Sequence, residues 1–147
     1  MLFVVLINML VKEIMTKNVV KIEEDKSVYD ACIKYRDLKV GSLIITKNGL
    51  CIGIITERDI IERTICDRKD PGKTLISEIM TGDLKYIHPL DTVEKALDIM
   101  IKENIKKLPV MTGKDIVGII TVTDISKARP ELSKRFMDSW VKPAWID

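Results

Sequence analysis

The sequence predicts a mixed α/β (α+β) protein built from two copies of one unit. Residues 53–60 read GIITERDI and residues 118–125 read GIITVTDI, 65 positions apart. The same shift places residues 11–63 over residues 76–128 without a gap, so the repetition extends well beyond the octet. About fifty residues rarely bury enough apolar surface to be stable alone, so we expect the two copies to pack together with pseudo-twofold symmetry.

Each copy is predicted to run strand, helix, strand, strand, helix. A short helical turn, VKEIMT or ISEIMT, precedes an extended stretch, NVVKI or LKYI. Ser27 or Thr92 then caps an amphipathic helix, in which apolar residues recur at helical spacing. These residues are Val28, Ala31, Cys32 and Tyr35 in the first copy, and Val93, Ala96, Leu97 and Met100 in the second.

Two β-rich runs follow this helix in each copy. They are GSLIIT and CIGIIT in the first copy, and KLPVM and IVGIIT in the second. The sequences between them, KNGL and TGKD, contain the Asn-Gly and Gly-Lys pairs that favour tight hairpins. The last run enters a second helix at TERDIIERTI or TVTDISKA.

Three segments lie outside the repeats. Residues 1–10 are an N-terminal extension, in which FVVLI predicts an added edge strand or a buried dimer contact, although Met9 is an alternative start. Residues 64–75 are the connector, with Asp70-Pro71-Gly72 as its turn.

Residues 129–147 are predicted to form a C-terminal helix and tail. Phe136 and Trp140 lie four positions apart, which suits an anchor on a partner and equally a helix packed on the protein's own surface. Pro143 should end that helix.

Composition argues against several classes of protein. The 24 basic and 22 acidic residues are spread along the chain, so no electrostatic footprint for nucleic acid or an anionic membrane emerges, apart from one local cluster, RTICDRKDPGK. Three cysteines and a single histidine lack the spacing of zinc ligands and fit a reducing cytoplasm. The opening MLFVVLINML is about half the roughly 20 residues that a membrane span needs. We therefore expect a cytoplasmic protein without a metal site.

No catalytic constellation is evident in the sequence. His88 has no partner motif, and no nucleophile-base pair, P-loop or paired catalytic carboxylates can be identified. The prediction is that the protein is not an enzyme.

The repeated Thr-x-x-Asp admits two interpretations. Thr56 with Asp59, and Thr121 with Asp124, have the spacing of a helix capping box. Alternatively, the aspartate accepts two sugar hydroxyls while the helix start faces an anion. Both can hold together, because a hydroxyl and a carboxylate each have more than one acceptor site.

The ordered motifs resemble a known family. EIMT, GSLIIT or KLPVM, and GIITxxDI, each in its place in both copies, are similar to a tandem pair of cystathionine β-synthase (CBS) domains, or Bateman module, over about residues 9–128. The resemblance implies a regulatory sensor that needs no cofactor and binds adenosine nucleotides or adenosyl compounds in two clefts between the repeats. AMP, ADP, ATP, S-adenosylmethionine and methylthioadenosine share the adenosine end. It also implies a homodimer and a regulated partner protein.

The resemblance assigns roles to residues. Asp59 and Asp124 would hold the ribose hydroxyls of the two sites, and Thr56 and Thr121 would support the ribose or first phosphate. The adenine would lie against the strands, near Val19, Val20, Ile22, Leu43 to Ile45, Leu84, Lys85, Ile87, and Leu108, Pro109 and Val110, whose apolar side chains are expected in the core in any case.

The two sites are not expected to be equal. Arg58 could bind phosphate in the first copy, where the second has Thr123, and Glu57 is expected to be solvated. Lys106 and Lys107 replace Gly41 and Ser42 of the first copy and are candidates for phosphate contact or for a solvated turn.

The leading interpretation is thus an adenosyl-ligand sensor that modulates a partner. The alternative is a nucleic-acid- or protein-binding scaffold that uses the same fold without an adenosyl ligand.

Overall fold

The computed structural model describes residues 8–140, except for the side chain of Trp140. The predictions for FVVLI and Pro143 therefore lie outside the described residues. Within residues 8–140, no helix combines the length and the apolar character that crossing a membrane requires.

The chain forms two compact units, each of which takes segments from both repeats. The first, here called the β1–β3 unit, consists of residues 18–85 with 113–116. The second, the β4–β5 unit, consists within the described residues of 8–17, 86–112 and 117–140. The short leading helix of each repeat consequently belongs to the unit built by the other repeat.

The two exchanged helices, α1 (Val11–Ile14) and α4 (Ile76–Ile79), are held by matching backbone bonds. The amides of Val11 and Lys12 donate to the carbonyls of Asp91 and Pro89, at 2.8 and 3.0 Å. Shifting each residue by 65 gives the other unit's bonds, Ile76 and Ser77 to Lys26 and Glu24, at 2.9 and 3.1 Å. The repeat therefore reproduces the contacts of its exchanged helix, not only its own elements.

In the β1–β3 unit, strands β1 (Lys21–Glu23) and β2 (Ser42–Lys47) are parallel, and β2 is antiparallel to β3 (Leu50–Thr56). Asn48 and Gly49 turn the hairpin at φ 52° and 79°, as their sequence predicts. Helix α2 (Val28–Leu38) begins at the Ser27 cap, and α3 (Glu57–Ile60) continues as the π-helical turn η1 (Ile61–Ile65). The core contains Ile22, Val28, Ala31, Leu43, Ile45, Ile55, Ile60, Ile76 and Ile79.

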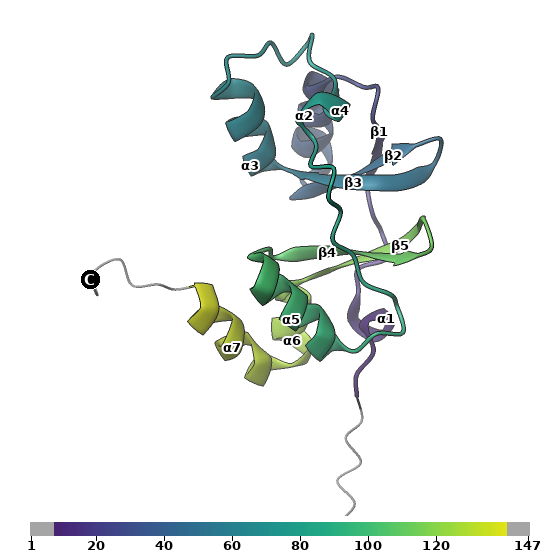
Figure 1. Cartoon of the computed structure of the whole chain (residues 1–147), viewed down its shortest axis with the longest axis vertical. Helices are drawn as coiled ribbons and strands as arrows, with labels where there is room; N and C mark the ends of the chain where they lie inside the picture. Colours follow the sequence, from purple (N-terminus) through teal and green to yellow (C-terminus); the bar gives the residue numbers. More distant parts are fainter. Residues whose placement is uncertain (1–7, 141–147) are drawn as a thin grey trace, which may run out of the picture. The chain divides into compact units, whose positions relative to one another are not determined.

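In the β4–β5 unit, helices α5 (Val93–Glu103), α6 (Val122–Ala128) and α7 (Pro130–Trp140) gather beside the hairpin of β4 (Lys107–Thr112) and β5 (Asp115–Thr121) (Figure 1). Thr92 caps α5 by accepting from the Lys95 amide at 3.2 Å. The core contains Val11, Ile87, Val93, Ala96, Leu97, Met100, Leu108, Val110, Ile120, Ile125 and Phe136.

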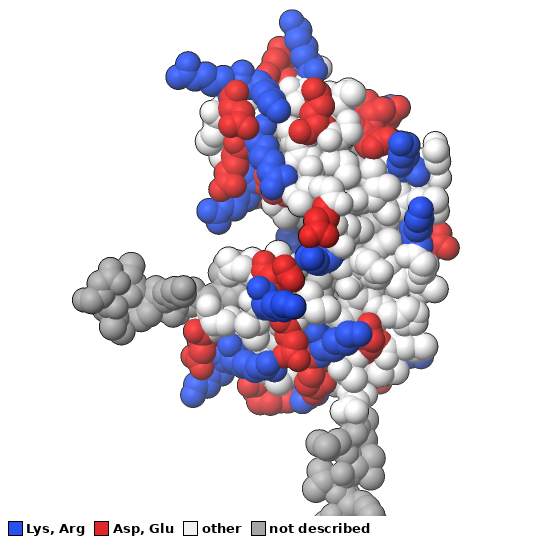
Figure 2. Space-filling model, viewed as in Figure 1, with Lys and Arg blue, Asp and Glu red and all other residues white. Residues whose placement is uncertain are grey.

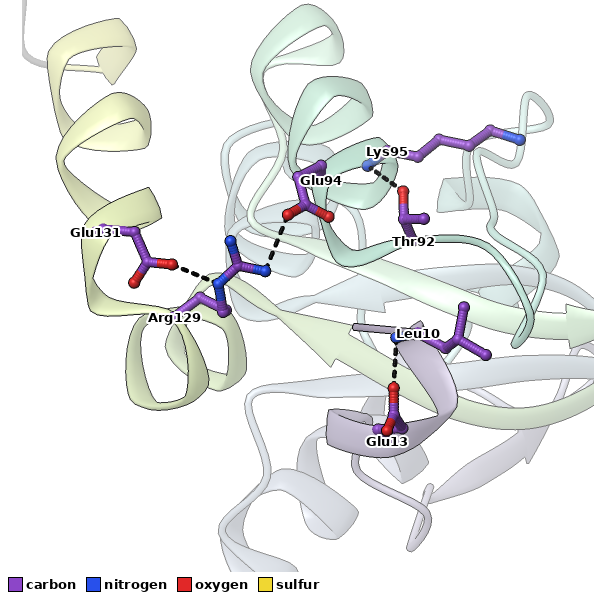
Figure 3. A network of polar contacts seen from close by, with 7 residues as sticks. All are labelled: Leu10, Glu13, Thr92, Glu94, Lys95, Arg129 and Glu131. Atoms are coloured by element: carbon purple, nitrogen blue, oxygen red, sulfur yellow. Dashed lines mark hydrogen bonds and ion pairs between the residues drawn. The ribbon is translucent and has the colours of Figure 1, made fainter. Parts of the chain in front are cut away.

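Helix α7 packs on its own unit. Phe136 is 2% exposed within the core, so of the two interpretations of this side chain, packing on the protein's own surface is correct. Arg129 pairs with Glu94 of α5 at 2.9 Å and with Glu131 of α7, which ties the start of α7 to α5 (Figure 3).

The predicted first strand differs between the copies. Three residues of β1 pair with β2, whereas the second copy has one isolated bridge, Ile87 to Val110. In the first copy, Ile44 donates to Val20 and Glu24 donates to Thr46, both at 2.9 Å. The equivalent residues are Pro109 and Pro89, which have no amide hydrogen, so both flanking bonds are impossible.

The connector is ordered as a packed turn. The amides of Gly72 and Lys73 donate to the side chain and carbonyl of Asp70, at 2.9 and 3.0 Å, which confirms the predicted turn. Thr64 and Thr74 are buried, so this segment belongs to the body of the β1–β3 unit.

Candidate functional site

The Thr56–Asp59 pair lies where β3 ends and α3 begins. Thr56 is extended, at φ −114° and ψ 166°, and its amide and hydroxyl donate to Oδ2 of Asp59 at 2.9 and 3.1 Å. The Asp59 amide donates back to the Thr56 hydroxyl at 3.4 Å. These bonds satisfy amides at the helix start that have no partner within the helix.

The Thr121–Asp124 pair repeats this geometry at the start of α6. Thr121 has φ −120° and ψ 163°, its amide donates to Oδ2 of Asp124 at 2.9 Å, and the Asp124 amide returns a bond to the Thr121 hydroxyl at 3.1 Å. The capping interpretation is therefore confirmed for both pairs. Ser27 and Asp30 form a third capping box, as their spacing predicts.

Capping uses one oxygen of each aspartate in these pairs. Both capping bonds to Asp59 end on Oδ2, and the Thr121 amide likewise donates to Oδ2 of Asp124. A carboxylate has about four lone-pair positions, so the cap leaves Oδ1 able to accept from another donor.

A residue that sequence reasoning left without a role lies beside Asp124. The hydroxyl of Thr16, the last residue of the first EIMT, lies 3.3 Å from Oδ1 and 3.5 Å from Oδ2 of Asp124. The Thr16 amide and carbonyl also pair with Ile119 of β5, at 2.8 and 2.9 Å. The available signal was the recurrence of the whole EIMT motif, including its threonine, in both copies.

The β1–β3 unit is different at the equivalent position. Nη1 of Arg63 donates to the Thr81 hydroxyl at 2.8 Å and to the Ile79 carbonyl at 2.9 Å. The sequence placed Arg63 only in the basic cluster 63–73 and not at the ligand site; its counterpart in the second copy is Ala128.

Tyr35 adds a polar group near Asp59. Its hydroxyl donates to the Ile55 carbonyl in β3 at 2.6 Å. Burial raises the pKa of the Tyr35 phenol, and the carboxylates of Asp59 and Glu57 raise it further. Tyr35 therefore stays a neutral hydrogen-bond donor beside the strand end.

The predicted basic residues occupy different surroundings. The Arg58 side chain is 80% exposed and pairs with Glu62 at 2.8 Å. Lys107 lies in β4, and the Lys106 carbonyl accepts from the Val122 amide at 3.0 Å, which places the Lys106 backbone at the start of α6. Lys85 pairs with Asp83 at 3.0 Å.

The residues assigned to an adenine surface are largely core residues. Ile22 faces Ile45 in the parallel register, and Ile87 bridges Val110. Burial of the set is high: Ile22, Ile87, Leu108 and Pro109 are buried, and Val20 is half-buried.

No metal-binding group is present among residues 8–140, where no cluster of three or more His, Cys, Asp or Glu is suitably placed. The Nδ1 of His88 accepts from the Leu90 amide at 3.1 Å within a surface turn. Cys32, Cys51 and Cys66 are free, and burial raises the thiol pKa of the first two.

Charges of both signs are mixed on the face of the molecule that Figure 2 shows. Lysine and arginine are interspersed with aspartate and glutamate on this face. Opposite charges also form ion pairs in the described residues, such as Lys95 with Asp91. Among the described residues drawn on this face, acidic side chains interrupt the basic ones within each unit, unlike the continuous basic surface that follows a phosphate backbone.

The repeated unit itself identifies the family. A family model described as the CBS domain matches residues 11–65 and again residues 76–131. The chain belongs to the CBS domain family. Tandem CBS pairs are known as regulatory modules and often bind adenosyl ligands, and CBS-domain proteins are generally regulatory rather than enzymes.

Curated relatives agree with this assignment. The CBS pair is 29% identical over 116 residues to the CBS domain-containing protein YhcV of Bacillus subtilis, covering 79% of this chain and 82% of that protein. It is 32% identical over 109 residues to the mitochondrial CBS domain-containing protein CBSX3 of Arabidopsis thaliana, covering 71% of this chain and 53% of that protein.

Solved structures share the CBS fold. An uncharacterized conserved protein from Pyrococcus horikoshii has a TM-score of 0.76 at 28% identity, covering 82% of this chain and 92% of that one. A hexameric CBS-CP12 protein from bloom-forming cyanobacteria has a TM-score of 0.73 at 32% identity, covering 81% and 67%. The mixed fold of two CBS repeats expected from the sequence is thereby confirmed.

Proposed function

We propose that this CBS pair senses adenosine nucleotides or adenosyl compounds, with Asp59 and Asp124 each holding a ribose, and that the bound ligand alters a partner protein. The supporting observation is that the same aspartate recurs at both strand-to-helix junctions with one carboxylate oxygen outside the cap. The vicinal hydroxyls of a ribose are two donors that match a carboxylate.

The surrounding residues suit the rest of such a ligand. Thr56 and Thr121 present hydroxyls next to the aspartates, and each hydroxyl has further hydrogen-bonding capacity beyond its cap. Arg58 is the proposed phosphate-binding residue of its unit, because an exposed ion pair such as Arg58–Glu62 contributes little to stability and is easily exchanged for a phosphate. Lys106 and Lys107 are the proposed phosphate-binding residues of the other unit.

The proposed ligand class comprises compounds that contain adenosine. AMP, ADP, ATP, S-adenosylmethionine and methylthioadenosine all carry the ribose that the aspartates would bind. No cofactor is required for a sensor of this kind, and the free cysteines fit a cytoplasmic location. We also propose a homodimer; the hexameric assembly of the CBS-CP12 protein, which shares 32% identity, supports self-association.

The test is calorimetric titration of the protein with this panel, beside Asp59→Asn and Asp124→Asn. Asparagine keeps an oxygen for the cap but loses the charge and an acceptor. Each variant should lose one of the two binding events, and Asp30→Asn, in the third capping box, should lose none. Flat titrations across the panel would contradict the proposal.

The alternative function, a nucleic-acid- or protein-binding scaffold, can be tested separately. Its one sequence feature is the basic segment 63–73, and Arg63 of that segment already donates to Ile79 and Thr81. Binding to duplex DNA or RNA that weakens steeply with salt would support it. No retention on nucleic acid at low salt would remove the nucleic-acid form of this alternative.

A further inference from the structure

We propose that the two ribose-binding carboxylates are functionally unequal: Oδ1 of Asp59 is left open to a ligand, because its contacts from Thr56 end on Oδ2, whereas Thr16 contacts both oxygens of Asp124. Thr16 and Arg63 are the positioning residues that produce the difference. This inference rests on the proposed function, and it specifies which of the two sites an adenosine ligand occupies first.

In the β4–β5 unit, the segment after α1 lies directly on β5. Thr16 pairs with Ile119 through both backbone groups, and its hydroxyl reaches Asp124 at 3.3 Å. A Cβ atom added to Gly118 would lie 2.8 Å from Sδ of Met15 and 2.9 Å from the Thr16 carbonyl oxygen. The approach is thus so close that only glycine permits it.

In the β1–β3 unit, the equivalent segment is held back. Arg63 binds the Thr81 hydroxyl and the Ile79 carbonyl, and within residues 8–140 no hydrogen bond joins Thr81 to Asp59. A Cβ on Gly53 would meet Cε of Met80 at 3.2 Å and then Ile45 at 3.7 Å, with no backbone atom among its nearest neighbours. The Arg63 bonds and the wider space at Gly53 both indicate that the segment after α4 lies farther from β3 than the segment after α1 lies from β5.

The difference follows from single residues at equivalent positions. Arg63 has a guanidinium that engages the threonine hydroxyl, whereas Ala128 has no group that could do so. Thr16 is consequently available to the aspartate, and it competes with a ribose hydroxyl for the same oxygens. The contact is longer than an ordinary O–H···O bond, so we expect the competition to change affinity by about two- to fivefold.

Calorimetry with adenosine can measure each site separately. Adenosine carries no phosphate, so a direct Arg63-phosphate contact cannot contribute. In an Asp59→Asn background, which reports the Asp124 site, both Thr16→Val and Ala128→Arg should tighten binding about two- to fivefold, the second by capturing the Thr16 hydroxyl. In an Asp124→Asn background, Arg63→Ala should weaken binding by a similar factor, because Thr81 is released toward Asp59.

A rescue experiment separates positioning from direct contact. Adding Thr81→Val to Arg63→Ala should restore the affinity of the Asp59 site, because no hydroxyl remains to cover the carboxylate. If Arg63 touched the ligand itself, affinity would stay low in the double variant. The matched probe is 2′-deoxyadenosine, with which all of these differences should shrink because one competing hydroxyl is missing.

The possible failures are distinguishable. Equal affinity at the two sites, or no change in affinity with Thr16→Val, would overturn this inference and leave the proposed function intact. Absence of adenosine and AMP binding in the unmodified protein would overturn both. If Arg63→Ala fails to fold, the Thr16→Val and Ala128→Arg measurements in the other unit still decide the question.

Discussion

The β1–β3 and β4–β5 units share their backbone frame and differ at a few side chains. Both dock the exchanged helix through the same amides, and both begin their last helix with the same Thr-x-x-Asp box. They differ at two equivalent positions, because Ala128 replaces Arg63 and Pro109 replaces Ile44 in the second copy. The β4–β5 unit also has an additional helix, α7. Repetition therefore preserves the frame, while single substitutions within it give the two units different sites and edges.

The largest expected effect concerns α7, which has no counterpart in the described β1–β3 unit. Phe136→Ala should lower the free energy of unfolding by about 3–5 kcal/mol, because it empties a buried aromatic position in the core. Urea denaturation measures the loss. Met137→Ala is the matched control on the same helix, since Met137 is 54% exposed and should change stability by less than about 0.5 kcal/mol. Equal effects of the two variants would mean that α7 does not complete the core.

The equivalent glycines offer the next comparison. Gly118→Ala should destabilise the protein by about 1–3 kcal/mol, because the methyl group would collide with Met15 and the Thr16 carbonyl. Gly53→Ala should cost less than about 1 kcal/mol, because its closest neighbour is the flexible end of Met80. Thermal and urea unfolding of the pair check this. Similar losses would show that the two segments approach their strands equally closely.

The missing strand bonds can be restored in part. Pro109→Ile gives the second copy the residue of the first and should create an amide bond to the Lys85 carbonyl, equivalent to the bond from Ile44 to Val20. A net gain of about 0.5–1.5 kcal/mol from the bond is offset by about 0.4–1 kcal/mol, because the proline no longer restrains the unfolded chain. Slow hydrogen exchange at the new amide is the decisive measurement, and fast exchange would show that the strand cannot form.

The smallest expected effect is a pH dependence confined to the turn before α5. Burial alone would raise the pKa of Asp91, but bonds from the His88 amide and the Lys95 ammonium outweigh it and hold the pKa below its usual value. The carboxylate therefore stabilises the fold above its unfolded pKa, near 3.9, and this contribution is lost as pH falls through the folded value.

The equivalent residue, Lys26, provides the matched control for this pH effect. Asp91→Asn should reduce the stability difference between pH 7 and pH 3, and Lys26→Gln should leave it unchanged. Denaturation at a series of pH values tests both variants, and an unaltered profile in Asp91→Asn would contradict the assignment.

Local patterns predicted most of the secondary structure, because each pattern acts within a few residues. The caps at Ser27 and Thr92 and the Asn48-Gly49 turn form where their side chains and allowed φ values require. The expected strand LKYI shortened to a bridge because Pro89 and Pro109 remove donors, which is visible in the sequence only when both partner strands are known.

The candidate site was predicted less completely. Thr56, Asp59, Thr121 and Asp124 were found because repetition marks them, and their capping role follows from spacing alone. Thr16 and Arg63 were missed as site residues because their partners lie outside any local motif: Thr16 reaches Asp124 over 108 positions, and Arg63 reaches Ile79 and Thr81 over 16 and 18. No local pattern encodes such a contact.

The amino-acid sequence by itself determined the duplicated unit, most of its element order, the family resemblance and the capping aspartates Asp59 and Asp124, because all of these depend on short-range patterns repeated in one register. Only the tertiary structure decided that each leading helix joins the unit of the other repeat, that Phe136 is buried, and that a threonine from the exchanged segment contacts Asp124 whereas the equivalent Thr81 binds Arg63. These outcomes depend on which distant segments pack together, and packing is settled by the burial and hydrogen bonding of the whole unit rather than by any one stretch of it.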